Sequence, residues 1–131
     1  MKITRASDMA GGPGPAEYFT GDVTITPLHK VEGPERAGAL RVRFEAGART
    51  AWHTHPLGQL LIVTEGEGWV RKEGEAKQVI RPGDTIWFEA GERHWHGATA
   101  TSAMEHIAVQ EAVDGSAADW AEHVADADYL G

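Results

Sequence analysis

Residues 59–98 read QLLIVTEGEGWVRKEGEAKQVIRPGDTIWFEAGERHWHGA, and this stretch decides the fold class. Runs rich in Val, Ile, Leu, Trp and Phe alternate here with turn-forming clusters such as Glu65-Gly66-Glu67-Gly68 and Arg81-Pro82-Gly83-Asp84. Similar runs occur on either side of it. The predicted strands cover residues 23–28, 40–45, 59–64, 69–72, 77–80, 85–88, 94–98 and 103–111. Many short strands separated by such turns indicate an all-β fold, either an antiparallel sandwich or a barrel.

The two ends of the chain depart from this pattern. Residues 1–20 contain Ala10-Gly11-Gly12-Pro13-Gly14-Pro15 and are predicted to form an irregular arm. Near the other end, Ser116 is a candidate N-cap, and Asp119 three residues later completes a weak capping box. We therefore predict a short C-terminal helix over residues 116–129, which covers the domain or a partner subunit and carries no chemistry.

Composition sets limits on the function. The chain has 131 residues, which suits a single domain spanning 1–131, and its hydrophobic content of 41% is enough for a core. Cysteine is absent, which excludes disulfides, thiolate metal sites and cysteine nucleophiles. A formal net charge of −8 disfavours nucleic acid as a partner. No apolar run has membrane-spanning length and no signal peptide is visible, so we expect a cytoplasmic protein with no membrane partner.

Alternation along the predicted strands assigns their faces. Leu40, Val42 and Phe44 share one side of their strand, which is expected to face inward, because Arg41 and Arg43 occupy the other side.

The last strand carries apolar residues on both sides. His106 and Gln110 share the face that we expect to point into the interior, opposite Ile107 and Val109. The apolar outer face of Ile107 and Val109, together with the edges of the sheet, predicts a homo-oligomer, either a dimer or a tetramer.

Four residues are candidate ligands of a divalent transition metal: His53, His55, Gln59 and His94. His53 and His55 are two residues apart, so in an extended segment their side chains project from the same face. A turn then brings in Gln59 at the start of the next strand, and His94 arrives from a later strand. Imidazole nitrogens and an amide oxygen suit manganese, iron, cobalt, nickel or zinc. Four protein ligands leave coordination positions open, as in catalytic sites.

The spacing of these ligands resembles the two motifs of the cupin superfamily, whose members are small β-barrels with a metal in the barrel mouth. The motifs stand here as Gly47-x5-His53-x-His55-x3-Gln59-x6-Gly66 and Gly83-x10-His94. The resemblance implies a cupin-type antiparallel β-barrel, or jelly roll. In this chain Gln59 stands where the family ordinarily has a glutamate ligand, and Glu89 stands where it ordinarily has a proline.

A closer similarity is to single-domain bacterial cupins that act as manganese-dependent hydroxynitrile lyases. It extends over nearly the whole chain and is carried by residues 47–59, by His94-Trp95-His96-Gly97-Ala98 and by Asp119-Trp120-x-Glu122-His123-Val124. The resemblance implies that the four candidate ligands bind manganese, that His106 is an active-site histidine and that Gln110 is a polar residue close to it. Leu40 stands where we expect a smaller residue in the substrate pocket.

The implied reaction is the reversible cleavage of an aromatic cyanohydrin, a small-molecule substrate, to an aldehyde and hydrogen cyanide. A metal with only neutral ligands is a strong Lewis acid toward the substrate hydroxyl, and His106 is the expected general base. His96 and Thr50 lie two or three residues from a ligand in sequence and are expected to assist. The expected apolar wall for the aryl or alkyl group consists of Leu40, Val42, Phe44 and Leu61.

Two other classes of function fit the same ligands. A manganese or iron dioxygenase would bind O₂ at the open positions, and a non-catalytic cupin would use the metal only to bind a small ligand. His106 and Gln110 on the interior face favour the lyase, because a dioxygenase needs no such base.

Overall fold

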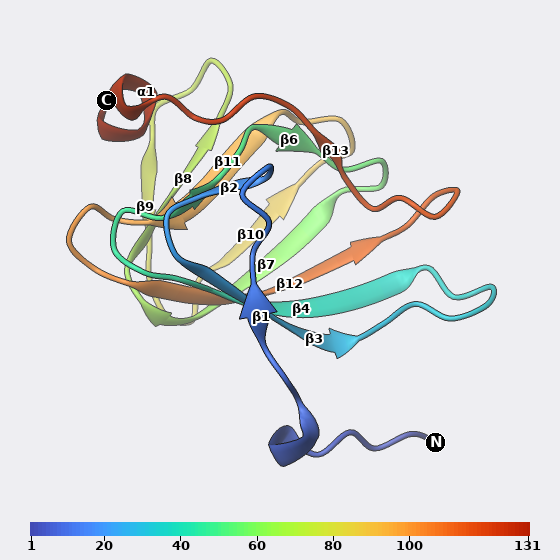
Figure 1. Cartoon of the computed structure of the whole chain (residues 1–131). Helices are drawn as coiled ribbons and strands as arrows, with labels where there is room; N and C mark the ends of the chain where they lie inside the picture. Colours follow the sequence, from blue (N-terminus) through green and yellow to red (C-terminus); the bar gives the residue numbers. More distant parts are fainter.

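The computed structural model describes residues 1–131 and confirms the all-β fold class. Two antiparallel sheets face each other (Figure 1). The first sheet contains, in spatial order, β1 (Gly12–Pro13), β3 (Val23–His29), β4 (Ala37–Phe44), β12 (Met104–Glu111), β7 (Gln59–Gly66) and β10 (Thr85–Phe88). The second contains β13 (Asp119–Trp120), β6 (His53–Thr54), β11 (His94–Ala98), β5 (Arg49–Thr50) and β2 (Phe19–Thr20), with β8 (Gly68–Lys72) and β9 (Gln78–Ile80) added beside β11.

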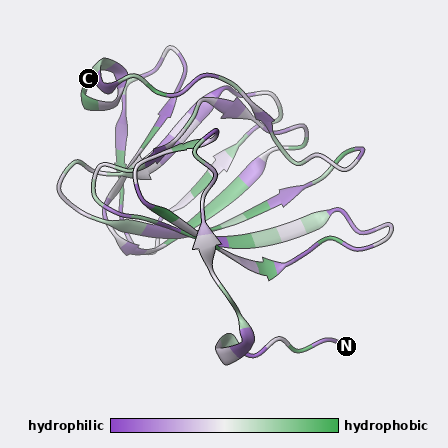
Figure 2. Ribbon diagram, in the orientation of Figure 1, coloured by the Kyte–Doolittle hydropathy of each residue, from purple (hydrophilic) through white to green (hydrophobic).

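The longer strands follow the predicted alternation. On β4, Val42 and Phe44 are buried and Leu40 is half-buried, as expected for the inward face. On β12, Met104, His106 and Ala108 are buried. Hydrophobic and hydrophilic residues are interspersed along the chain (Figure 2); they alternate on β4 from Leu40 to Phe44, whereas β12 carries apolar residues on both faces. The register sets His106 of β12 opposite Val42 of β4, so the interior faces of the two strands line one space.

The predicted C-terminal helix over residues 116–129 is wrong in its extent. The only α-helix is α1 (Asp126–Leu130), and Asp119–Trp120 instead forms β13, which pairs with β6. The Ser116 hydroxyl donates to the carbonyl of Ala118 and so caps no helix. Pairing with the edge of β6 and stacking of Trp120 on an aromatic ring stabilise this segment as a strand. These tertiary contacts override the weak local preference for a helix that Ser116 and Asp119 provide.

The N-terminal arm is also more ordered than predicted. Residues 6–8 form a 3-10 turn, and β1 and β2 both pair with other strands. The cause is Phe19, whose side chain is buried in the main core and draws this segment onto the barrel.

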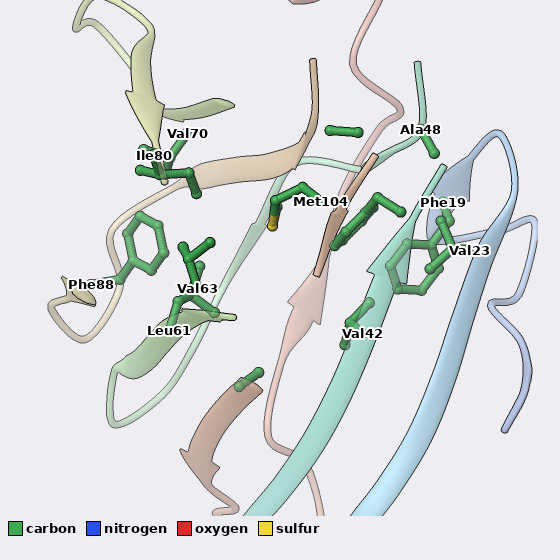
Figure 3. Packing of buried hydrophobic residues seen from close by; sticks show 13 residues of the cluster. Phe19, Val23, Val42, Ala48, Leu61, Val63, Val70, Ile80, Phe88 and Met104 are labelled. Carbon is green, nitrogen blue, oxygen red and sulfur yellow. The ribbon is translucent and has the colours of Figure 1, made fainter. Parts of the chain in front are cut away.

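The main core fills the space between the sheets (Figure 3). Phe44 and Leu61 are fully buried within it, with Met104 and Val63 beside them. A smaller cluster packs α1 against the second sheet and consists of Trp52, Trp95, Val124 and Tyr129.

With five residues in its only α-helix, the structure has no helix that could span a membrane.

Candidate metal centre

Histidine rings from three strands and one loop gather at one end of the space between the sheets. His53 on β6 and His94 on β11 are register partners, and their ring centroids are 4.3 Å apart. The ring of His55 lies 5.0 Å from that of His53 and 5.4 Å from that of His94. The structure therefore brings the three predicted histidine ligands together.

A hydrogen bond from Nδ1 to a backbone carbonyl oxygen orients each of these three rings. Nδ1 of His53 lies 2.9 Å from the carbonyl oxygen of Ala51, Nδ1 of His55 lies 2.7 Å from that of Ala117, and Nδ1 of His94 lies 2.8 Å from that of Glu92. A carbonyl oxygen only accepts, so Nδ1 carries the proton and Nε2 keeps its lone pair. The Nε2 atoms of His55 and His94 are buried without a hydrogen-bond partner. This is the arrangement that metal-binding imidazoles adopt.

Gln59 completes the predicted set at the start of β7. Its Nε2 donates to Oε1 of Gln110 across 3.1 Å, which leaves its own Oε1 buried and without a partner. Buried acceptors are ordinarily satisfied, so unpaired atoms from His55, Gln59 and His94 in one place fit a divalent cation. The donor set contains no charged side chain.

His96 is a further histidine of the site that sequence reasoning treated only as an assisting residue. Ligand nitrogens of His53, His94 and His96 lie within 4.8 Å of one another. Nδ1 of His96 lies 3.0 Å from Nε2 of His106, and Nε2 of His96 is buried without a partner. The signal was present in the sequence, because His94 and His96 have the same two-residue spacing as His53 and His55 and project from one face of β11.

Burial keeps these imidazoles neutral. It lowers the pKa of His94 to about 3 and that of His106 to about 4. Burial is also the main reason why the pKa values of His53 and His96 lie well below the ordinary value, with a smaller contribution from neighbouring histidines. Neutral imidazole is the form that binds a metal or accepts a proton.

A cavity of about 260 Å³ opens beside the histidines, and most of the other predicted site residues line it. Leu40, Val42, Thr50 and Gln110 contribute to its wall, as do His96 and His106. The Thr50 hydroxyl accepts a hydrogen bond from the backbone N–H of His96 at 3.2 Å, which ties β5 to β11.

Phe44 and Leu61 do not line this cavity. Both are fully buried in the main core, deeper than the space that a substrate could enter. Phe44 instead packs beneath the site, with its ring centroid 5.9 Å from that of His96 and 5.4 Å from that of His106.

Part of the remaining wall comes from segments near both ends of the chain. Tyr18 and Phe19 from the N-terminal segment, and Ala117, Ala118 and Trp120 from the C-terminal segment, all line the cavity. Sequence reasoning missed them because it placed these segments in an arm and a covering helix. The available signal was aromatic side chains in segments otherwise rich in small and polar residues.

The two facing sheets, with histidines converging at one end, define a β-barrel of the cupin class with a candidate metal site. The chain belongs to this family, because residues 40–110 match the model of the cupin domain. It is 56% identical to the (R)-mandelonitrile lyase of Granulicella tundricola over 129 residues, 98% of each chain.

Solved structures agree on the fold. A cupin-like protein from Thermotoga maritima has a TM-score of 0.87 and 36% identity over 91% of this chain and 90% of its own. The polyketide cyclase RemF from Streptomyces resistomycificus, at 18% identity, has a TM-score of 0.72 over 98% of this chain and 90% of its own. These matches confirm the expected cupin-type jelly roll.

Proposed function

We propose that this protein is a metal-dependent hydroxynitrile lyase, which reversibly cleaves an aromatic cyanohydrin to an aldehyde and hydrogen cyanide. The observation that carries the proposal is the buried, neutral imidazole of His106 in the wall of a cavity that three of the proposed metal ligands, His53, His55 and Gln59, also line. The likeness to an (R)-mandelonitrile lyase over 98% of the chain supports this choice of reaction.

The proposed ligands are His53, His55, Gln59 and His94, and the proposed ion is manganese. The partner of Nδ1 supports His55 rather than His96 as the third imidazole, because Nδ1 of His96 meets the ring of His106 and not a carbonyl oxygen. Nδ1 of His55 is held by a backbone carbonyl, as in the other two histidines, and its Nε2 is unpaired. A divalent ion bound there supplies Lewis acidity toward the substrate's alcohol oxygen.

In this proposal His106 accepts and returns the proton of the reaction, and His96 assists it. When Nε2–H of His106 donates to Nδ1 of His96, Nδ1 of His106 carries a lone pair and accepts the hydroxyl proton of the cyanohydrin. The electrons of that O–H bond form the aldehyde C=O, and the pair of the breaking C–C bond leaves with cyanide. In the same tautomer Nε2 of His96 bears a proton, so His96 can donate a hydrogen bond to the departing cyanide. His106 then transfers the proton that it accepted to the cyanide, which leaves as hydrogen cyanide.

The apolar part of the cavity accommodates the substrate's aryl group. Leu40 and Val42 from β4, Ile25 from β3 and Ala108 from β12 form this side. Leu40 is the bulkiest aliphatic group that reaches the cavity from β4. We therefore expect Leu40→Ala to raise kcat/KM for a ring-substituted mandelonitrile more than for mandelonitrile itself.

The decisive assay is benzaldehyde release from mandelonitrile by manganese- and iron-loaded protein, compared with His106→Ala. Loss of the base should lower turnover by about 10²- to 10⁴-fold. Unchanged turnover in His106→Ala would remove the base role from His106. If neither loaded form cleaves any of several cyanohydrins, the lyase assignment is wrong, and oxygen uptake with a catechol or diketone would then identify a dioxygenase.

We also propose that the protein self-associates through the outer face of its first sheet. Leu60 and Ile62 of β7 lie beside Val109 and Ile107 of β12 in register, and all four are only partly buried. Light scattering should give a dimer or tetramer for the parent protein and a smaller species for Ile107→Lys. A parent protein that is monomeric at micromolar concentration contradicts this arrangement.

A further inference from the structure

We propose that the C-terminal strap, defined as residues Ala117–Glu122, is the device that orients two metal ligands, with Trp120 as its positioning residue. The inference rests on the metal site proposed above and adds a role for a segment outside residues 40–110, which match the cupin domain.

The strap reaches each of the two histidines by a different contact. The carbonyl oxygen of Ala117 accepts the Nδ1–H of His55 at 2.7 Å. The indole of Trp120 stacks on the imidazole of His53, with centroids 4.5 Å apart and an angle of 30° between the planes. The first contact fixes the tautomer and direction of one ring, and the second fixes the plane of the other.

The backbone holds the strap in register with the ligands. Trp120 pairs with His53 and Asp119 pairs with Thr54 in the β13–β6 ladder. Two more backbone hydrogen bonds extend the ladder. The Trp52 N–H donates to the carbonyl oxygen of Glu122 at 3.0 Å, and the Ala121 N–H donates to the carbonyl oxygen of Trp52 at 2.8 Å. The strap therefore cannot shift without moving the strand that carries His53.

An aromatic side chain from the other end of the chain supports Trp120. The Tyr18 ring stacks on the indole with centroids 4.7 Å apart and an angle of 17°, and Phe19 lies at 5.8 Å. The indole thus has ring contacts with Tyr18 as well as with His53, which restricts its rotamer.

The test is Mn²⁺ affinity, measured from the electron paramagnetic resonance signal of free Mn²⁺ during titration, for Trp120→Leu, Trp120→Phe and Tyr18→Leu. Loss of an orienting group costs about 10- to 100-fold in metal affinity, so Trp120→Leu should raise the Kd by that factor and change the spectrum of bound Mn²⁺. Trp120→Phe, which keeps a ring, should recover most of the affinity, and Tyr18→Leu should lie between.

Trp69→Leu is the matched control. Trp69 is also half-buried and packs against an aromatic ring, that of Tyr129 at 5.0 Å, but it does not line the metal-site cavity. The Trp69→Leu variant should have a lower melting temperature than the parent protein but the same Kd for Mn²⁺. A folded Trp120→Leu protein with the parent's Kd and spectrum overturns the inference. If that variant does not fold, the parent's Kd in Tyr18→Leu overturns the inference instead.

Failure of the proposed lyase reaction would be recognised separately, because these measurements contain no cyanohydrin. A parent protein that binds Mn²⁺ but cleaves nothing leaves the role of the strap intact.

Discussion

Gln59 determines the charge of the candidate centre. An amide has two different ends, and only one of them can face a cation. The hydrogen bond from its Nε2 to Gln110 fixes the amide so that Oε1 is the end left unpaired, as the proposed metal site requires. Gln110 therefore matters to the site even though it supplies no ligand atom.

Replacing Gln59 by glutamate should separate metal affinity from reactivity. In Gln59→Glu the carboxylate adds a negative charge to a buried site, so Mn²⁺ should bind more tightly. The same charge reduces the Lewis acidity of the ion, so kcat for cyanohydrin cleavage should fall. Gln110 can rotate its amide and donate to the carboxylate, so the fold should tolerate the change.

Titration with Mn²⁺ and steady-state kinetics on the loaded variant measure the two effects. Gln59→Leu, which removes the ligand without adding charge, is the control and should bind Mn²⁺ more weakly than the parent. A glutamate variant with an unchanged Kd would mean that position 59 does not face the ion.

The proximity of His53 and His55 was predictable from sequence because two-residue spacing in an extended segment places both side chains on one face. His53 and His55 project to one side whatever surrounds them, and the short turn before Gln59 leaves little freedom. The choice between His55 and His96 as third imidazole was not predictable in this way. It depends on which Nδ1 meets a carbonyl oxygen, and Ala117, which meets His55, is 62 residues away in sequence.

At the scale of elements, the turn between β7 and β8 depends on Gly66. This residue has a φ of 74°, and a Cβ added to it would lie 1.9 Å from the carbonyl oxygen of Ala103. Gly74, in the turn after β8, has a φ of 84° and nothing within 4 Å of the same added atom. The two glycines share a backbone conformation and differ in their surroundings.

We expect Gly66→Ala to destabilise the protein far more than Gly74→Ala. The left-handed conformation alone should cost each variant about 1–2 kcal/mol. At Gly66 the backbone of the loop before β12, at Ala103, must also move, which adds about 1–3 kcal/mol. Urea denaturation of the two variants measures the difference, and equal midpoints would show that the loop at Ala103 yields without cost.

The C-terminal helix is anchored by a buried arginine. Arg49 Nη2 donates to the carbonyl of Val124 at 2.7 Å and to Asp126 Oδ1 at 2.8 Å, and its guanidinium lies 4.4 Å from the centre of the Tyr129 ring. The Arg49 side chain is 7% exposed, whereas that of Asp126 is 85% exposed. The hydrogen bond to the backbone therefore contributes more than the ion pair does.

Arg49→Met should lower the free energy of unfolding by about 1–3 kcal/mol, the usual cost of hydrogen bonds lost from a charged donor. Asp126→Asn should cost less than about 1 kcal/mol, because the carboxylate is largely in water. Thermal unfolding of both variants followed by circular dichroism tests the order, and a larger loss in Asp126→Asn would reverse it.

Strands of three residues or more were predictable from the sequence. β10 and β11 have the predicted bounds, and β4, β7 and β12 differ from them by a few residues. The two-residue strands were not predictable, because two residues cannot show an alternation. β13 forms because Trp120 stacks against His53 and Tyr18. No local sequence pattern predicts these long-range contacts.

At the scale of the whole molecule, the buried histidines make metal-free protein sensitive to acid. The pKa of His106 falls to about 4 in the folded state, from an ordinary value of 6.5. Below pH 6.5 the unfolded chain therefore takes up a proton that the folded chain refuses, and folding becomes less favourable as pH falls. At about 1.4 kcal/mol per pH unit, His106 alone accounts for about 3 kcal/mol between pH 6.5 and 4.

The melting temperature of chelator-treated protein should therefore be constant above about pH 7.5 and fall steeply between pH 6.5 and 4. His106→Gln removes one titrating group and should reduce the slope in this range. A melting temperature that does not change between pH 7 and 5 would show that protons reach these rings in the folded state.

The stacking of Tyr18 on Trp120 brings residues from near the two ends of the chain together over the ligands. This has a consequence for biosynthesis. A nascent chain that still lacks residues 117–122 already contains all four proposed ligands, yet it has neither the carbonyl that aims His55 nor the indole that holds His53. We therefore expect the ion to be acquired after residues 117–122 leave the ribosome, so that the metal is selected by the folded site and not by the emerging chain.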